Sequence, residues 1–167
     1  LPSLALDNTL VTGAQRIFSG ISNFTLIAIP FFILAGNIMN QGGIAKKVVA
    51  FAQSLTGRIP GSLMQTNILA NMMFGAISGS SVAACAAMGG ILLPMEEQEG
   101  YDQTLGDTVN IATAPTGLLI PPSNSLIVYS LVSGGTSVAA LFMAGYLQGI
   151  LWGLGCMILT FFLAKSR

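Results

Sequence analysis

The sequence carries very little charge. Charged side chains make up 7% of its 167 residues, against roughly 25% in an ordinary soluble domain. Six basic and six acidic residues cannot cover the surface of a water-soluble globule of this size. Long runs without any charge extend over residues 17–45, 59–95 and 108–164, and each exceeds the roughly 18–20 apolar residues that span a bilayer. The sequence therefore predicts an all-α integral membrane protein in contact with the lipid bilayer.

Histidine is absent, which excludes histidine-based catalysis, histidine metal sites and imidazole proton relays. The few basic residues are spread along the chain, so the sequence contains no basic cluster that would bind nucleic acid. Cys85 and Cys156 lie far apart in apolar stretches, and we interpret them as small buried residues without a metal or disulfide role. No signal peptide is visible and the first residue is Leu1, so we expect a piece of a longer protein, cut among its membrane helices.

The first 61 residues are predicted to form three helical pieces. Residues 1–23 have apolar side chains near helical spacing, which is typical of an amphipathic segment at the membrane interface. Residues 24–40 suit a spanning helix, kinked at Pro30 and ended by a Gly-Gly pair. Residues 44–55 suit a short amphipathic arm, whose apolar face is expected to carry Ile44, Val48, Phe51 and Leu55.

Residues 62–95 are too many for one membrane span, yet they contain no polar loop that would divide them into two spans. The sequence Ser-Gly-Ser-Ser at 78–81 stands in the middle. Each half is about 16 residues, or about 24 Å of helix, which is short of the roughly 30 Å hydrocarbon core. This segment is therefore predicted to be a re-entrant helical hairpin, with its tip inside protein or beside a wet cavity.

The remaining residues are predicted to form a loop, a broken helix and a crossing. Residues 96–107 suit an acidic cytoplasmic loop. Residues 108–136 suit a discontinuous helix, because a proline pair at 121–122 pushes the preceding residue away from helical conformation. Residues 137–167 suit a spanning helix, in which glycines at four-residue spacing form a close-packing face.

The basic residues support this topology. A re-entrant hairpin puts the following five on one side of the membrane: Lys46, Lys47, Arg58, Lys165 and Arg167. The positive-inside rule makes that side cytoplasmic. If this segment crossed the membrane fully, Lys165 and Arg167 would lie on the opposite side of the membrane from the other three.

Two helix breaks in long charge-free runs are the feature that discontinuous-helix transporters use. Unwound backbone frees carbonyl oxygens, and serine hydroxyls add neutral oxygen donors that can replace part of the water shell of Na⁺. Helix N-termini at the same breaks suit an anionic group. Either break alone has a simpler interpretation, as a helix-packing patch or a proline kink, and their combination favours function. The asparagines Asn67, Asn71 and Asn110 are interpreted first as interhelical hydrogen-bonding residues and second as substrate contacts.

Five ordered motifs resemble the large membrane subunit of tripartite ATP-independent periplasmic (TRAP) transporters. They are IPFFILAG at 29–36, GGIAKK at 42–47, FGAISGS at 74–80, GYD at 100–102 and GLLIPPS at 117–123. The resemblance covers nearly the whole chain. It implies the first repeat of an inverted-repeat, elevator-type transporter, without the leading helices and the second half.

The resemblance also implies a function. Such systems import organic anions, such as dicarboxylates or sugar acids, into bacteria or archaea across the cytoplasmic membrane, driven by a Na⁺ gradient. A periplasmic binding protein delivers the substrate, a small membrane subunit supports the scaffold, and no organic cofactor is needed. Carried over onto this chain, the Na⁺ site would use Ser78, Ser80, Gly117, Ile120 and Pro122, the last three through main-chain oxygens. Candidate substrate contacts are Ser81, Thr116, Ser123 and Asn124.

One other function remains open from the sequence, and a second lacks the residues that it needs. A non-transporting membrane scaffold or assembly module would use the small-residue breaks only for packing. An intramembrane hydrolase would need a base near Ser78, and the charge-free spans around it contain no histidine, lysine or aspartate.

Overall fold

Helices form every regular element in the described part of the chain, as predicted. The computed structural model describes residues 2–22 and 24–166, with side chains for residues 8–20, 22, 29–39 and 41–165. Residues 1, 23 and 167, which the predicted segments 1–61 and 137–167 include, lie outside the described residues. In chain order the helices are α1 (Pro2–Ile21), α2 (Phe24–Gln41), α3 (Ile44–Thr56), α4 (Ser62–Ser78), α5 (Ser81–Gln98), α6 (Gln103–Thr113), α7 (Thr116–Leu119), α8 (Asn124–Val132) and α9 (Val138–Ser166).

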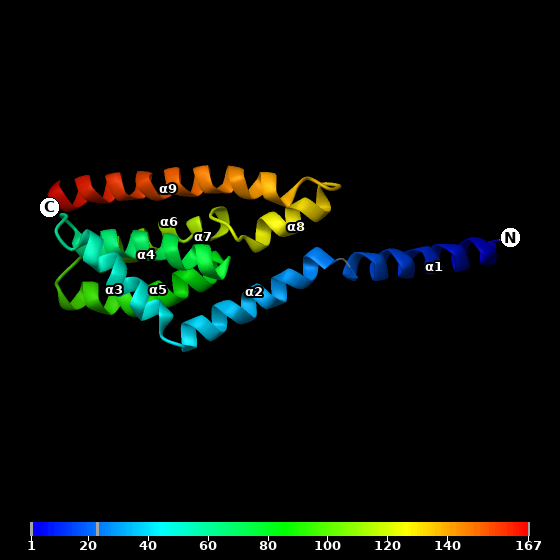
Figure 1. The fold of residues 1–167 in the computed structure, drawn as a ribbon, viewed down its shortest axis with the longest axis horizontal. Helices are drawn as coiled ribbons and strands as arrows, with labels where there is room; N and C mark the ends of the chain where they lie inside the picture. Colours follow the sequence, from blue (N-terminus) through cyan, green and yellow to red (C-terminus); the bar gives the residue numbers. More distant parts are fainter. Residues whose placement is uncertain (1, 23, 167) are drawn as a thin grey trace.

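The first two helices lead from the N-terminus into the bundle. α1 extends away from the other helices (Figure 1), and its described side chains are exposed; its predicted place at a membrane interface stays a prediction. α2 contains Pro30, as expected, and packs against α4 and α8. It ends where the Gly-Gly pair was predicted to end it, because Gly43 adopts the left-handed conformation with φ 74°.

The apolar face predicted for α3 is wrong in part. Val48 is buried as expected, but Phe51 and Leu55 are more than half exposed. The face that packs on α4 carries small or β-branched residues instead: Ala45, Val48, Val49, Ala52 and Thr56. Alanines let two helix backbones approach closely, so the larger side chains are displaced to the outside.

Helices α4 and α5 form a helical hairpin over the segment predicted to do so, and its re-entry into the membrane stays a prediction. They lie side by side in antiparallel directions, and the chain reverses at Gly79 and Ser80 (Figure 1). Gly79 adopts a left-handed conformation with φ 64°, and its N–H donates to the Gly75 carbonyl at 2.8 Å, which closes the end of α4. Ser80 caps the N-terminus of α5, where its hydroxyl oxygen accepts from the Ala83 N–H at 3.3 Å.

The discontinuous helix predicted over 108–136 is also present. It consists of α6, the single turn α7 and α8, interrupted at residues 114–115 and 120–123. The peptide bond between Pro121 and Pro122 is cis. Ser123 caps α8 by accepting from the Leu126 N–H at 3.3 Å.

The predicted close-packing face of α9 is confirmed. A methyl group added at Gly145 would overlap the Leu119 carbonyl, and one added at Gly149 would overlap the Ile120 side chain. The glycines thus let α9 lie directly on the end of α7, so that this helix holds the break at residues 120–123 in place.

One helix among the described residues is long and apolar enough to cross a membrane. It covers Val138–Lys165, with a mean hydropathy of 1.9, and only 17% of its most apolar window is buried. A core helix of a soluble protein would be mostly buried, so the exposure of α9 agrees with contact to lipid or to another membrane segment.

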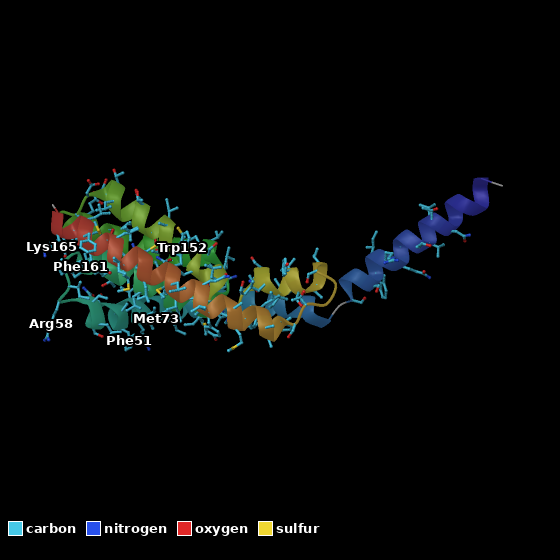
Figure 2. All side chains as sticks on the ribbon, turned by 90° about the horizontal axis from the view of Figure 1, so that it is seen from above. Phe51, Arg58, Met73, Trp152, Phe161 and Lys165 are labelled. Atoms are coloured by element: carbon cyan, nitrogen blue, oxygen red, sulfur yellow. The ribbon has the colours of Figure 1, made fainter. Side chains whose placement is uncertain are left out.

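The acidic segment predicted as a loop over 96–107 is helical at both ends. α5 continues to Gln98, α6 begins at Gln103, and Glu96 is buried rather than solvated. This turn lies at the same end of the molecule as the start of α4 and the end of α9 (Figure 1), because Gly61, Tyr101 and Ala164 line one pocket of about 550 Å³. Figure 2 shows Arg58 and Lys165 at this end as well.

Candidate functional site at two helix breaks

The two helix breaks contact each other directly. The backbone N–H of Asn124, at the start of α8, donates to the carbonyl of Gly79 at the hairpin tip, over 3.4 Å. The Pro122 carbonyl oxygen lies so close to Gly79 that a Cβ at that glycine would stand 2.5 Å from it. The hairpin tip and the proline break therefore form one site, although more than forty positions separate them in the sequence.

Two glycines bring the flanking helices together beside this contact. A Cβ built at Gly75 in α4 would overlap the Cα of Gly117 in α7 and would lie 2.9 Å from its nitrogen. A Cβ built at Gly117 would lie 3.0 Å from the Gly75 Cα and 3.3 Å from the Ser80 carbonyl oxygen. Backbone meets backbone here, which only glycine permits.

The tip serines hold the turn of the hairpin. Ser78 is buried, its hydroxyl donates to the Ser80 carbonyl at 3.3 Å, and its oxygen accepts from the Ser80 N–H at 3.4 Å. The half-buried Ser80 keeps one hydroxyl lone pair beyond the bond that caps α5. Both predicted side-chain ligands thus lie at the tip, with oxygen atoms that can accept or coordinate.

The three main-chain oxygens predicted for the ion lack their helical donors. Pro121 stands four residues after Gly117 and has no N–H to donate. Asn124 stands four residues after Ile120 and donates to Gly79 instead. The Leu126 N–H, four residues after Pro122, donates to the Ser123 hydroxyl. The break thus leaves three carbonyl groups without a helical donor, and the carbonyl of Pro122 lies against Gly79 at the hairpin tip.

The helix ends at this site have opposite polarity. The C-terminus of α4 brings partial negative charge to the tip, which favours a cation. The N-termini of α5 and α8 bring partial positive charge, which favours an anionic group. Neutral oxygens and helix ends of both polarities can bind a monovalent cation beside an anion without any ionised side chain.

The four candidate substrate residues differ in what their side chains do. The hydroxyl of Thr116 is buried and donates to the Thr113 carbonyl at 2.7 Å, and Ser123 is buried as the cap of α8. Ser81 lines a groove of about 430 Å³ between α5 and α6. Asn124 has a buried side-chain oxygen without a hydrogen-bond partner. An unpaired buried acceptor costs roughly 1–3 kcal/mol, so the Asn124 oxygen is available for a ligand.

The three asparagines predicted to form interhelical hydrogen bonds do so. The Asn71 amide donates to the side-chain oxygens of Asn67 at 2.7 Å and of Asn110 at 3.0 Å. The Asn110 amide in turn donates to the Cys85 carbonyl at 3.1 Å. This network joins α4, α5 and α6 behind the hairpin tip, and Asn67, Asn71 and Asn110 are all buried. Asn67 also donates to the Glu96 carboxyl at 3.3 Å.

Sequence reasoning missed two features of the site. Gly75 and Gly79 form a GxxxG pattern, which is a signal of close helix approach, but the sequence does not say that Gly117 is the partner. Glu96 was assigned to an acidic loop, whereas it is buried and contacts Asn67 of α4, a neutral residue far from it in the sequence. The indole N–H of Trp152 donates to the Ala112 carbonyl at 2.8 Å, which ties α9 to the end of α6.

Comparison with known proteins places these features in a family. Residues 3–167 match the family model described as the tripartite ATP-independent periplasmic transporter, DctM component. Among the relatives, the "Uncharacterized protein YgiK" of Salmonella typhimurium is 60% identical over 157 residues, which cover 94% of this chain and 36% of that protein.

Two further relatives carry transport names. The sialic acid TRAP transporter large permease protein SiaM of Vibrio cholerae is 39% identical over 154 residues. The C4-dicarboxylate TRAP transporter large permease protein DctM of Pseudomonas aeruginosa is 40% identical over 154 residues. Each match covers 92% of this chain and 36% of the relative. The chain thus spans about a third of the length of these relatives.

Proposed function

Because the chain belongs to the DctM family of TRAP transporter large permeases, which are membrane transport proteins and not enzymes, we propose that it forms part of a Na⁺-coupled importer of an organic anion. The names of two relatives refer to sialic acid and to C4-dicarboxylates, and both are organic anions. We place the protein, as part of this proposal, in the bacterial or archaeal cytoplasmic membrane.

The observation that carries the proposal is the contact between the hairpin tip and a helix break whose three carbonyl groups lack helical donors. Na⁺ is bound by several neutral or charged oxygens, and the candidates here are neutral and come from the hairpin tip and the proline break: Ser78, Ser80, Gly117, Ile120 and Pro122. Discontinuous helices in secondary transporters bind coupling ions with oxygens of this kind.

The substrate is proposed to lie on the same face as the N-termini of α5 and α8. These ends attract an anionic group, and Ser81 and Asn124 stand at the first turn of each helix. Ser81 lines an open groove, and Asn124 has a free acceptor that can receive a substrate hydroxyl or amide. Thr116 and Ser123, whose hydroxyls are engaged locally, are assigned to shaping the break.

The hairpin is proposed to enter the membrane and return. α4 has 17 residues and α5 has 18, of which those up to Met95 are proposed to enter the membrane. Even the whole of α5 is only roughly 27 Å long, less than the roughly 30 Å hydrocarbon core. Both outer ends of the hairpin lie at the end of the molecule that carries Arg58 and Lys165 (Figure 2). An elevator-like movement of this hairpin against a scaffold is part of the proposal.

The topology is testable by cysteine labelling. We expect cysteines at Ser54 and Gln98, placed in a full-length protein with Cys85 and Cys156 replaced, to react only with membrane-permeant thiol reagents in intact cells. Both positions are exposed and flank the hairpin. Reaction of the Gln98 position with an impermeant reagent from outside would show that the hairpin segment crosses the membrane.

The proposed partners follow from the same family. A small membrane subunit would cover part of the exposed apolar surface of α2, α3 and α9, and a periplasmic binding protein would deliver the substrate. A second candidate function is a non-transporting helical scaffold, which the close packing of Gly75 on Gly117 also favours. The two candidate functions predict different results: a Na⁺-coupled transporter requires Na⁺ for substrate uptake, whereas a scaffold does not itself take up substrate.

A further inference from the structure

A single carboxyl group is buried at the end of α5. Glu96 is 2% exposed, and its Oε2 atom has no hydrogen-bond partner. This oxygen lies directly on the backbone of α6, because a methyl group added at Gly106 would overlap it. The residue follows the segment 62–95 that is proposed to enter the membrane, and the proposed Na⁺ site does not include it.

Among the side chains that the structure describes, no cation faces Glu96. From α4, the Asn67 amide donates to Oε1 at 3.3 Å. From α6, Gly106 contacts Oε2 and Asp107 is the neighbouring charged residue. From the connecting turn, the Tyr101 N–H donates to the backbone carbonyl of Glu96 at 2.9 Å. On its own helix, the next residue is the acidic Glu97.

An ionised carboxylate in these surroundings is unfavourable. Burial without a paired charge costs several kcal/mol in proteins. The cost disappears when the carboxyl binds a proton. Burial raises the pKa of Glu96, the hydrogen bond from Asn67 lowers it, and the negative charge of Asp107 raises it.

We propose that Glu96 is a proton-binding site, which carries a proton while α5 and α6 are packed together. Binding of the proton to Glu96 therefore stabilises the arrangement in which α5 and α6 are packed together. Hydrogen bonds through Asn67, Asn71 and Asn110 connect this carboxyl group to the backbone of α5 at Cys85. The proposal goes beyond Na⁺-coupled transport and does not depend on it, since protonation can be measured without substrate.

Infrared spectroscopy of the purified full-length protein tests the proposal. The unmodified protein should show, at neutral pH, the carbonyl stretch of a neutral carboxylic acid, and Glu96→Gln should remove it. The matched control is Glu97→Gln, at the exposed adjacent position, which should leave the band in place. Absence of the band from the unmodified protein at neutral pH, or its persistence in Glu96→Gln, would overturn the proposal.

Two further measurements test the proposal, so that it does not depend on the infrared band of Glu96→Gln alone. In Gly106→Ala the added methyl should displace the carboxyl toward water, so the band should disappear at a lower pH than in the unmodified protein. Unfolding should depend on pH in a defined direction: a folded-state pKa above the unfolded value means that stability falls as pH rises between the two. Glu96→Gln should lack that fall. An unchanged band in Gly106→Ala and an unchanged pH profile in Glu96→Gln would both contradict the proposal.

Discussion

Replacing Gly75 by valine is expected to abolish Na⁺-driven uptake by the full-length protein. The new Cβ would overlap the Gly117 Cα, and neither atom can move without shifting a helix backbone. Overpacking of this kind costs about 1–3 kcal/mol or more. The shift would also separate the hairpin tip from the freed carbonyl groups, and binding sites tolerate errors of only about 0.5 Å.

The measurement is substrate uptake together with the thermal unfolding temperature of the purified variant. The matched control is Gly90→Val, also within a hairpin helix, because nothing lies within 4 Å of a Cβ built there. Both variants carry the same helix-propensity cost, so their difference isolates the contact with Gly117. Normal uptake by Gly75→Val would mean that α4 and α7 need not touch for function.

Replacing Ser80 by alanine is expected to lower the apparent affinity for Na⁺ by about tenfold to over a hundredfold. Removing a hydrogen-bond-like contact to a charged group costs about 1.5–3 kcal/mol, and about 1.4 kcal/mol corresponds to tenfold in affinity. The same change removes the cap of α5, which costs about 0.5–2 kcal/mol of stability.

Two measurements separate these effects. The cap loss appears as a lower unfolding temperature in Na⁺-free medium, whereas the ligand loss appears as a shift of the curve of uptake against Na⁺ concentration. Ser78→Ala should shift that curve as well, and Ser62→Ala, at the far end of α4, should not. If Ser80→Ala lowers stability but leaves the curve in place, Ser80 serves only as a cap.

The breaks in the helices could be predicted from the sequence because their causes are local. A glycine with positive φ, a capping serine and a proline without an N–H act on their immediate neighbours. For that reason the hairpin over 62–95 and the interruption at Pro121 and Pro122 appear where they were expected. The glycine face of α9 was equally visible, as a four-residue repeat.

The contacts between distant segments could not be predicted in the same way. Phe51 was expected on the packed face of α3, but which face packs depends on the alanines that fit α4. Glu96 looked like a loop residue because acidic neighbours surround it in sequence, while Asn67 and Gly106, which bury it, come from other helices. The pairing of Gly79 with Asn124 likewise depends on the fold.

The most direct test of Na⁺ coupling is uptake by the full-length protein, reconstituted into liposomes with its membrane subunit and binding protein. Uptake is compared between an inward Na⁺ gradient and a K⁺ gradient of equal ionic strength. The account predicts uptake in Na⁺ and only background in K⁺. Equal uptake in both media would contradict it, and the oxygens at the two helix breaks would then have no ion to bind.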